Sequence, residues 1–262
     1  MPNDYDAPSC SIKFLPRERQ VEAANNAIAI NPANAPAHAL PVFAFGDAPP
    51  KPVQLTALTT KYWGSGGVRL TVGFLDNPAA DLRARILSHM NAWGEFCNVQ
   101  FTETATDPEV RIARTPGDGY WSYLGTDVKL IPAGEPTMNL DSFSMDQTPD
   151  SEFHRVVRHE TGHTLGFPHE HLRREVVDRI DREKAIAYFM QTQGWPRDMV
   201  IAQVLTPLDE VSIIGTPDAD TDSIMCYSLP ASIMKDGVAV PGGADIDAQD
   251  AQFVSKLYPK TL

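Results

Sequence analysis

Three histidines and one glutamate stand in a short run whose spacing could hold a metal ion and activate water. The run is residues 159–169, HETGHTLGFPH, with the pattern H-E-x-x-H-x-x-G-x-x-H. Helical residues four positions apart share one face, so His159 and His163 can direct their imidazoles at one point. Gly166 can adopt a left-handed backbone that ends the helix and turns the chain, which would bring His169 to the same point.

Three neutral imidazoles with an open fourth position are the ligand set of a catalytic zinc site. Glu160 follows the first of these histidines and is placed to take a proton from water held there. The five fixed positions make a chance match rare, whereas H-E-x-x-H alone is common. We therefore predict one catalytic Zn²⁺ held by His159, His163 and His169, with Glu160 as the general base.

The extended run resembles the signature of the metzincin metallopeptidases. That clan also has a methionine-containing turn beneath the zinc, and Ser223-Ile224-Met225-Cys226-Tyr227 matches it downstream. The resemblance implies a structural role for Met225. The tyrosine two positions later is similar to that of the astacin and serralysin branches, where it lies near the metal as an extra ligand or as a donor to the oxyanion of the reaction. Tyr227 would inherit that catalytic role.

Local runs narrow the resemblance to astacin-like enzymes, especially bacterial-type relatives. His169-Glu170-His171-Leu172-Arg173, then Asp178-Arg179-Ile180-Asp181, resembles the astacin run H-E-Q-x-R-x-D-R-D, and 244–259 resembles their closing helix. The match covers about residues 61–259. Two features depart from it: three cysteines cannot form the two disulfides of animal astacins, and Cys226 stands where histidine is usual.

The resemblance implies an α+β metzincin catalytic domain. Its twisted, mostly parallel sheet carries a backing helix and an active-site helix, and an irregular C-terminal subdomain follows with a terminal helix. We expect a Pro/Ala-rich N-terminal arm over 1–58 and a catalytic domain over 59–262. Within that domain the N-terminal subdomain would cover 59–166 and the C-terminal subdomain 167–262.

Hydrophobic periodicity supplies the elements that must position the motif. Alternation predicts a strand over 68–74, and further strands are expected at 99–103, 109–114 and 127–131, with a Gly-rich loop at 117–125. Helices are expected at 17–28, from Pro78 through Trp93, at 151–165 with an Asp150 or Ser151 cap, and at the C-terminus. Metzincins hold substrate extended and antiparallel to an edge strand. Our candidate for that strand is 109–114, and an interior strand is the competing interpretation.

The N-terminal arm contains two candidate zinc-blocking residues. Astacin propeptides block zinc with the aspartate of F-x-G-D, and Phe43-Ala44-Phe45-Gly46-Asp47 resembles that motif with the phenylalanine displaced. A Gly-Asp turn in a linker is the simpler interpretation of Asp47. Cys10 could act as a thiolate plug, as in matrixin propeptides, but lacks their P-R-C-G surroundings, so we rank it below Asp47. Simple free thiols are the expectation for all three cysteines.

Other polar residues receive structural or solvent-exposed interpretations. These are the four remaining histidines, His38, His89, His154 and His171, and the acidic run 218–222, which we expect to be a solvated turn. In astacins the residue matching Glu170 meets the new N-terminus of the activated enzyme. Here either cleavage near Lys61 creates such an end or Glu170 pairs locally with Arg173 or Arg174, and we favour the local pair.

Composition limits the partners that the chain could have. Its 262 residues carry 22 Lys+Arg against 34 Asp+Glu, a formal net charge of −12. Binding to nucleic acid or to anionic membranes depends on positive charge, so we expect neither. No run is long and apolar enough for a membrane helix, and no secretory signal is visible. The expected location is cytoplasmic or reached by a non-standard export route, with extracellular action suggested by the family. We expect a monomer.

These features together predict a zinc-dependent endopeptidase that binds a protein or peptide substrate extended along an edge strand. A zinc hydrolase restricted to short peptides or to a non-peptide amide would share the same residues. An inactive metzincin used as a binding module is a third interpretation. It would normally lack a ligand or Glu160, and none is missing here.

Overall fold

The computed structural model describes residues 10–35, 57–58, 61–209, 213–215 and 218–260. Its main sheet joins six strands in the spatial order β1-β6-β7-β5-β3-β4. These strands are β1 (Cys10–Lys13), β3 (Val68–Phe74), β4 (Val99–Glu103), β5 (Val110–Ala113), β6 (Tyr120–Tyr123) and β7 (Met138–Leu140). Only the pairing of β6 with β7 is antiparallel. The expected α+β fold with a mostly parallel sheet is confirmed.

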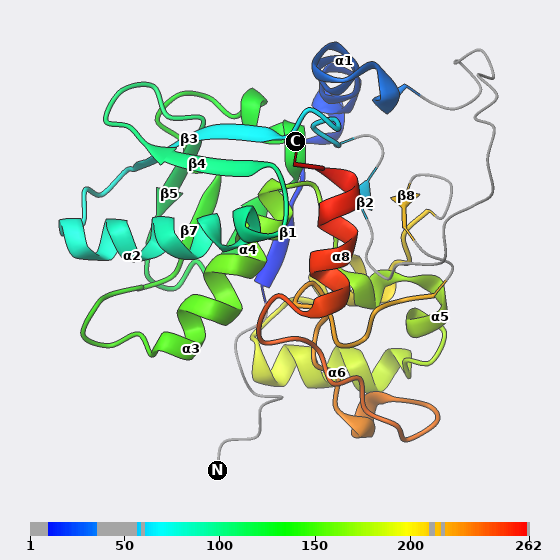
Figure 1. The fold of residues 1–262 in the computed structure, drawn as a ribbon. Helices are drawn as coiled ribbons and strands as arrows, with labels where there is room; N and C mark the ends of the chain where they lie inside the picture. The colour runs from blue at the N-terminus through cyan, green and yellow to red at the C-terminus, as the bar shows by residue number, and fades with distance from the viewer. Residues whose placement is uncertain (1–9, 36–56, 59–60, 210–212, 216–217, 261–262) are drawn as a thin grey trace.

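Eight α-helices accompany the sheet in the described part of the chain. They are α1 (Gln20–Ile30), α2 (Ala80–Met90), α3 (Asp150–Glu152), α4 (Arg158–Thr164), α5 (Arg174–Val177), α6 (Arg182–Thr192), α7 (Arg197–Val200) and α8 (Ala248–Leu257). Short strands β2 (Ala57–Leu58) and β8 (Ile213–Ile214) form a separate antiparallel pair. Figure 1 places β3, β4, β5 and α2 in one half of the molecule and α5 and α6 in the other. No helix among the described residues is both long and apolar enough to cross a membrane.

The active-site helix is continuous from Asp150 through Thr164. A π-helical turn, Phe153–Val157, joins α3 to α4. The expected helix at 151–165 is therefore confirmed, but its first turn has no side-chain cap, because Pro149 occupies the N-cap position. The backing helix α2 buries Leu82, Ile86 and Met90.

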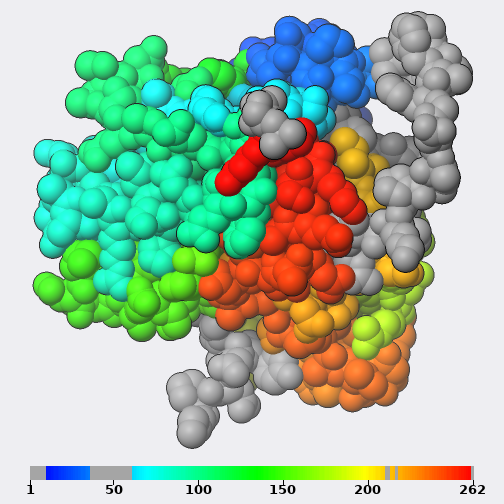
Figure 2. All heavy atoms as spheres, in the orientation of Figure 1, coloured from blue at the N-terminus to red at the C-terminus, as the bar shows by residue number. Residues whose placement is uncertain are grey.

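A large apolar core fixes the active-site helix between the sheet and the C-terminal half. It includes Trp93, Phe153, Phe167 and Met225, each no more than 1% exposed. The terminal helix closes this core, and its capping box joins Asp247 with Asp250. In the space-filling view α8 lies at the surface between the two halves (Figure 2). A second core lies in the C-terminal half, where Val200 and Val204 pack with Tyr227.

Three sequence predictions about the sheet are wrong. Residues 127–131 do not form a strand, because Gly125–Leu130 is a 3₁₀ helix whose Asp127 side chain turns inward to pair with Lys61. The expected loop at 117–125 contains strand β6. In addition, β5 lies between β7 and β3, so the proposed edge strand 109–114 is an interior strand. Without β1, the edge of the sheet would be β6.

The N-terminal segment is packed onto the rest of the chain. Strand β1 extends the sheet beyond β6, and α1 lies near Gly125–Leu130, where Asn26 Nδ2 donates to the carbonyl of Thr126. Leu15, Ala23 and Ile131 form a small core beneath α1. The boundary between an arm over 1–58 and a catalytic domain over 59–262 stays a prediction.

Candidate metal centre and active site

The active-site helix presents two of the predicted zinc ligands with their tautomers fixed. His159 Nδ1 lies 2.6 Å from the carbonyl oxygen of Ile224, and His163 Nδ1 lies 2.7 Å from that of Phe167. A carbonyl oxygen can only accept, so both Nδ1 atoms must carry hydrogen. Each Nε2 is then an unprotonated lone pair, the form that binds a metal.

The turn after the helix delivers the third ligand. Gly166 has φ of +102°, a left-handed backbone that favours glycine, and its N–H donates to the carbonyl of His163. The chain reverses there and brings His169 Nε2 to 3.2 Å from His159 Nε2 and 3.1 Å from His163 Nε2. Two nitrogens at about 2.1 Å from a tetrahedral zinc ion lie about 3.4 Å apart. The three histidines therefore fit the ion.

Glu160, the predicted general base, lies next to His159 on the same helix. Its side chain is fully buried, and neither carboxylate oxygen makes a hydrogen bond of ordinary geometry to a described residue. Burial raises the pKa of Glu160 well above its ordinary value, while Cys10 and Arg155 oppose the rise. Burying a carboxylate is costly unless it is hydrogen-bonded, so Glu160 is suited to accept from a polar group such as water.

The methionine turn lies directly beneath the active-site helix. Met225 is fully buried, and its sulfur packs against Gly162, where a Cβ atom would overlap it. Asp250 of α8 holds this turn, accepting from Ser223 Oγ at 2.7 Å and from the backbone N–H of Ile224 at 3.1 Å. Burial raises the pKa of Asp250 to about 7. The structural role predicted for Met225 stays a prediction.

Tyr227 lies beside the third histidine. Its ring centroid is 4.4 Å from that of His169 and 4.0 Å from that of His171, on which it stacks. The Tyr227 hydroxyl donates to the main-chain carbonyl of Cys10. The oxyanion-stabilising role of Tyr227 stays a prediction.

Cys10 completes the cluster, contrary to its low rank in the sequence interpretation. Its Sγ lies 2.9 Å from Nε2 of His159, 3.3 Å from that of His163 and 3.0 Å from that of His169. These four buried residues form a group able to hold a metal ion in a tetrahedral arrangement. Cys10 is a free, buried thiol, as expected, but it lies among the three histidines. Asp47, the other candidate, lies outside the described residues.

Strand pairing explains how the thiol reaches this point without a recognisable motif. β1 pairs in parallel with β6, with Cys10 opposite Tyr120 and Ile12 opposite Ser122. On the other side of β1, the carboxamide of Gln203 pairs with the main chain of Ile12. β1 thus lies as an extended peptide between β6 and the C-terminal half.

Sequence reasoning missed several residues around the site. His171 is fully buried and its Nε2 donates to the carbonyl of Gln203 at 2.9 Å. Asp220 is 2% exposed, so the expected solvated turn at 218–222 is wrong at that residue. Its backbone N–H donates to Glu170 Oε2 at 3.4 Å. The local pairing of Glu170 with Arg173 or Arg174 stays a prediction.

Two other histidines lie together away from the motif. His154 Nδ1 lies 2.8 Å from Asp245 Oδ2, and its ring contacts that of His89 edge-on. The structural role expected for both agrees with this packing. His38 lies outside the described residues.

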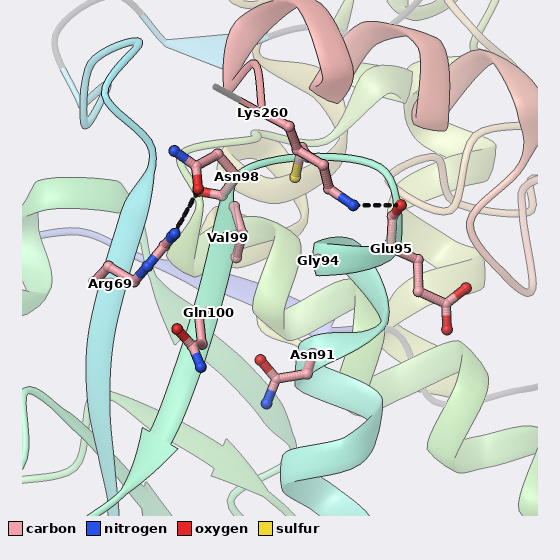
Figure 3. Close-up of a pocket in the computed structure, with 9 residues that line it drawn as sticks. Arg69, Asn91, Gly94, Glu95, Asn98, Val99, Gln100 and Lys260 are labelled. Atoms are coloured by element: carbon pink, nitrogen blue, oxygen red, sulfur yellow. Dashed lines mark hydrogen bonds between the residues drawn. The ribbon is translucent and has the colours of Figure 1, made fainter. Parts of the chain in front are cut away.

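An open pocket of about 640 Å³ lies on a different part of the molecule (Figure 3). It is lined by Arg69, Asn91, Gly94, Glu95, Cys97, Asn98, Val99, Gln100 and Lys260. Lys260 Nζ donates to the carbonyl of Glu95 across one side of it. No residue of the histidine cluster lines this pocket, so the pocket is separate from the candidate metal centre.

Comparison with known proteins gives the same family that the sequence motifs resemble. The model of the peptidase family described as Astacin matches residues 56–238. Zinc metalloproteinase nas-27 of Caenorhabditis elegans is 38% identical over 93 residues, which are 35% of this chain and 19% of that protein. Tolloid-like protein 1 of Mus musculus is 28% identical over 138 residues, 49% of this chain and 12% of that one. The chain therefore spans about a fifth or less of the length of these relatives.

Solved structures extend the likeness to most of the chain. The structure of myroilysin has a TM-score of 0.73 and 31% identity, and the match covers 79% of this chain and 100% of that one. High choriolytic enzyme 1, a hatching enzyme zinc-protease from Oryzias latipes (Medaka fish), has a TM-score of 0.51 at 18% identity, with 78% and 96% covered, and shows the fold alone. Since the family model matches more than half of its residues, the chain belongs to the astacin family of zinc metallopeptidases.

Proposed function

We propose that this chain is a latent zinc endopeptidase whose own N-terminal segment closes the active site. The observation that carries the proposal is the position of Cys10 Sγ, 2.9 to 3.3 Å from the three ligand nitrogens. A catalytic zinc site needs its fourth position for water and substrate. A thiolate there would exclude both.

The chain's own residues supply the rest of the proposed chemistry. His159, His163 and His169 would hold the zinc ion, which when bound would supply a Lewis acid for the scissile carbonyl and for water. Glu160 takes the proton of the attacking water and passes it to the leaving amine, so that one carboxylate serves as base and then as acid. The Tyr227 hydroxyl donates to the carbonyl oxygen as it gains negative charge.

The direction of β1 favours a blocking role over that of a substrate. β1 runs parallel to β6. Family resemblance implies that substrate runs antiparallel to the edge strand, so the peptide bonds of β1 are presented in reverse. In this reversed direction β1 still makes the main-chain contacts that hold it. The carbonyl and the amine of each peptide bond, however, are exchanged relative to their positions in a substrate. The segment can therefore occupy the cleft without being cleaved.

The test compares the full chain with Cys10→Ala, using casein as an unstructured protein substrate. Losing the thiol contact should raise the cleavage rate about 100-fold, which corresponds to about 3 kcal/mol of blocking interaction. Cys97→Ala is the matched control, because Cys97 is also buried but is not part of the cluster and donates to the Trp93 carbonyl. Equal rates for Cys10→Ala and the unaltered chain would refute the latent state.

The second arm tests the base. On the Cys10→Ala background, Glu160→Ala should retain one bound zinc and lose about 10²- to 10⁴-fold in rate, because the proton transfers lose their carrier. Undiminished cleavage would refute the role of Glu160. Casein and a five-residue peptide are compared in parallel. Cleavage of the peptide alone would favour an enzyme restricted to short peptides, and cleavage of neither by Cys10→Ala would favour a binding module.

A further inference from the structure

The main-chain groups of β1 that face away from β6 meet a second wall. In an extended strand the N–H and C=O groups of alternate residues point to the same edge. Cys10 and Ile12 share such an edge. The carbonyl of Cys10 accepts from the Tyr227 hydroxyl. The N–H of Ile12 donates to Gln203 Oε1 at 3.1 Å, and its carbonyl accepts from Gln203 Nε2 at 3.0 Å.

Gln203 is held firmly in this position. It lies on the π-helical turn Ile201–Leu205 that continues α7, and its side chain is 8% exposed. The neighbouring Val204 is packed in the second core with Tyr227. The main-chain carbonyl of Gln203 accepts from His171, whose ring stacks on Tyr227. Gln203 and Tyr227 are therefore positioned together by one packed unit.

A carboxamide is suited to bind a peptide of any sequence. It offers one acceptor and one donor, the same pair that a neighbouring strand would offer, and it contacts no side chain of Ile12 through these bonds. Rotation of the carboxamide by half a turn exchanges the donor with the acceptor. The same side chain can thus pair with a main chain that runs in the opposite direction to β1.

We propose that Gln203 is a substrate-binding residue that clamps the substrate main chain opposite β6. The proposal rests on the proposed function, since it needs β1 to give way to a substrate. Ile12 lies on the carboxy-terminal side of Cys10 in β1, and a substrate would run in the opposite direction to β1. The substrate residue that replaces Ile12 therefore lies on the amino-terminal side of the scissile bond. The cleft then has two polar walls, β6 on one side and Tyr227 with Gln203 on the other.

The test uses the unblocked full chain, Cys10→Ala, with Gln203→Met added. Methionine keeps the length of the side chain and removes both hydrogen bonds. We expect kcat/KM for a peptide of about eight residues to fall about 10- to 30-fold, mostly through KM, because the contact is present in both bound and transition states. Gln191→Met, an exposed substitution on α6, is the matched control and should leave kcat/KM unchanged.

A scan of N-methylated peptides separates a substrate contact from a structural role. Methylating one main-chain nitrogen at a time on the amino-terminal side of the scissile bond removes a single N–H. At one position the loss in kcat/KM should be large for Cys10→Ala and small for Cys10→Ala/Gln203→Met. Equal losses in both proteins at every position would overturn the proposal, as would an unchanged kcat/KM in the Gln203 variant. Failure of the proposed function is distinct, because Cys10→Ala would then cleave the peptide no faster than the unaltered chain does.

Discussion

The glycine inside the zinc-binding helix permits close packing of the methionine turn. A Cβ atom at Gly162 would overlap the Met225 sulfur and lie 3.1 Å from Met225 Cε and 3.4 Å from Cζ2 of Trp93. Both neighbours are fully buried, and Trp93 is fixed by its indole N–H, which donates to the carbonyl of Arg158 at 2.9 Å. Gly162→Ala therefore forces Met225 to move beneath the zinc ligands.

Two opposing terms set the size of this effect. Overpacking a filled core costs about 1 to 3 kcal/mol, and the overlap with a buried sulfur places Gly162→Ala near the upper end. Alanine stabilises a helix interior by about 1 kcal/mol relative to glycine. The expected net loss in the free energy of unfolding is about 2 kcal/mol, or about 4 to 8 °C in Tm for a chain of this size.

Urea denaturation of the zinc-loaded full chain measures this loss. Gly66→Ala is the control, because a Cβ atom there has no heavy atom within 4 Å. In the double variant Gly162→Ala/Met225→Ala the overlap is absent, so its loss should be smaller than the sum of the two single losses by about 1 to 2 kcal/mol. A Gly162→Ala protein as stable as Gly66→Ala, or additive losses, would refute this account of the turn.

Two further predictions concern buried charges. Burial and the nearby Asp247 carboxylate raise the pKa of Asp220 to about 6. The folded state then binds more protons than the unfolded state between about pH 4 and 6. The free energy of unfolding falls as pH rises through this range, and the ionised Asp220 destabilises the fold by its full amount above it. Asp220→Asn should accordingly raise the free energy of unfolding at pH 8 but not at pH 4, whereas exposed Asp146→Asn should change neither. Lys61 Nζ lies 2.6 Å from Asp127 Oδ1 with both side chains buried, so Lys61→Met should cost about 3 to 5 kcal/mol by leaving the carboxylate alone. Lys61→Met/Asp127→Leu should recover most of that loss in the same urea assay, and equal stabilities of the single and double variants would contradict the pairing.

Local spacing allowed the metal ligands to be predicted from the sequence. His159 and His163 are fixed by the helical repeat and His169 by a glycine turn, so each depends only on residues nearby in the chain. The backing helix and the terminal helix were predicted for the same reason, because their apolar faces repeat at helical spacing. Met225 was predicted because the histidine motif implies a methionine-containing turn further along the chain.

Predictions that depended on strand pairing were less successful. Tyr120–Tyr123 lies among glycines and has the surroundings of a loop, yet it becomes the strand next to β1. Residues 127–131 have the composition of a strand, but the buried pair of Asp127 with Lys61 favours a 3₁₀ helix. The edge strand was misplaced because the order of strands in a sheet is a property of contacts between distant segments.

The sequence by itself predicted the family, the three histidine ligands and Glu160 as the base, since these residues lie in one helix and the turn after it. Only the tertiary structure decided what faces the metal. Cys10 is separated from His159 by 149 residues and from Tyr227 by 217, and no local repeat links them. The contact of Gln203 with Ile12 spans 191 residues. The pairing of β1 with β6 produces all of these contacts together. It places Cys10 and Ile12 against the histidines, Tyr227 and Gln203, which the rest of the fold holds close to one another.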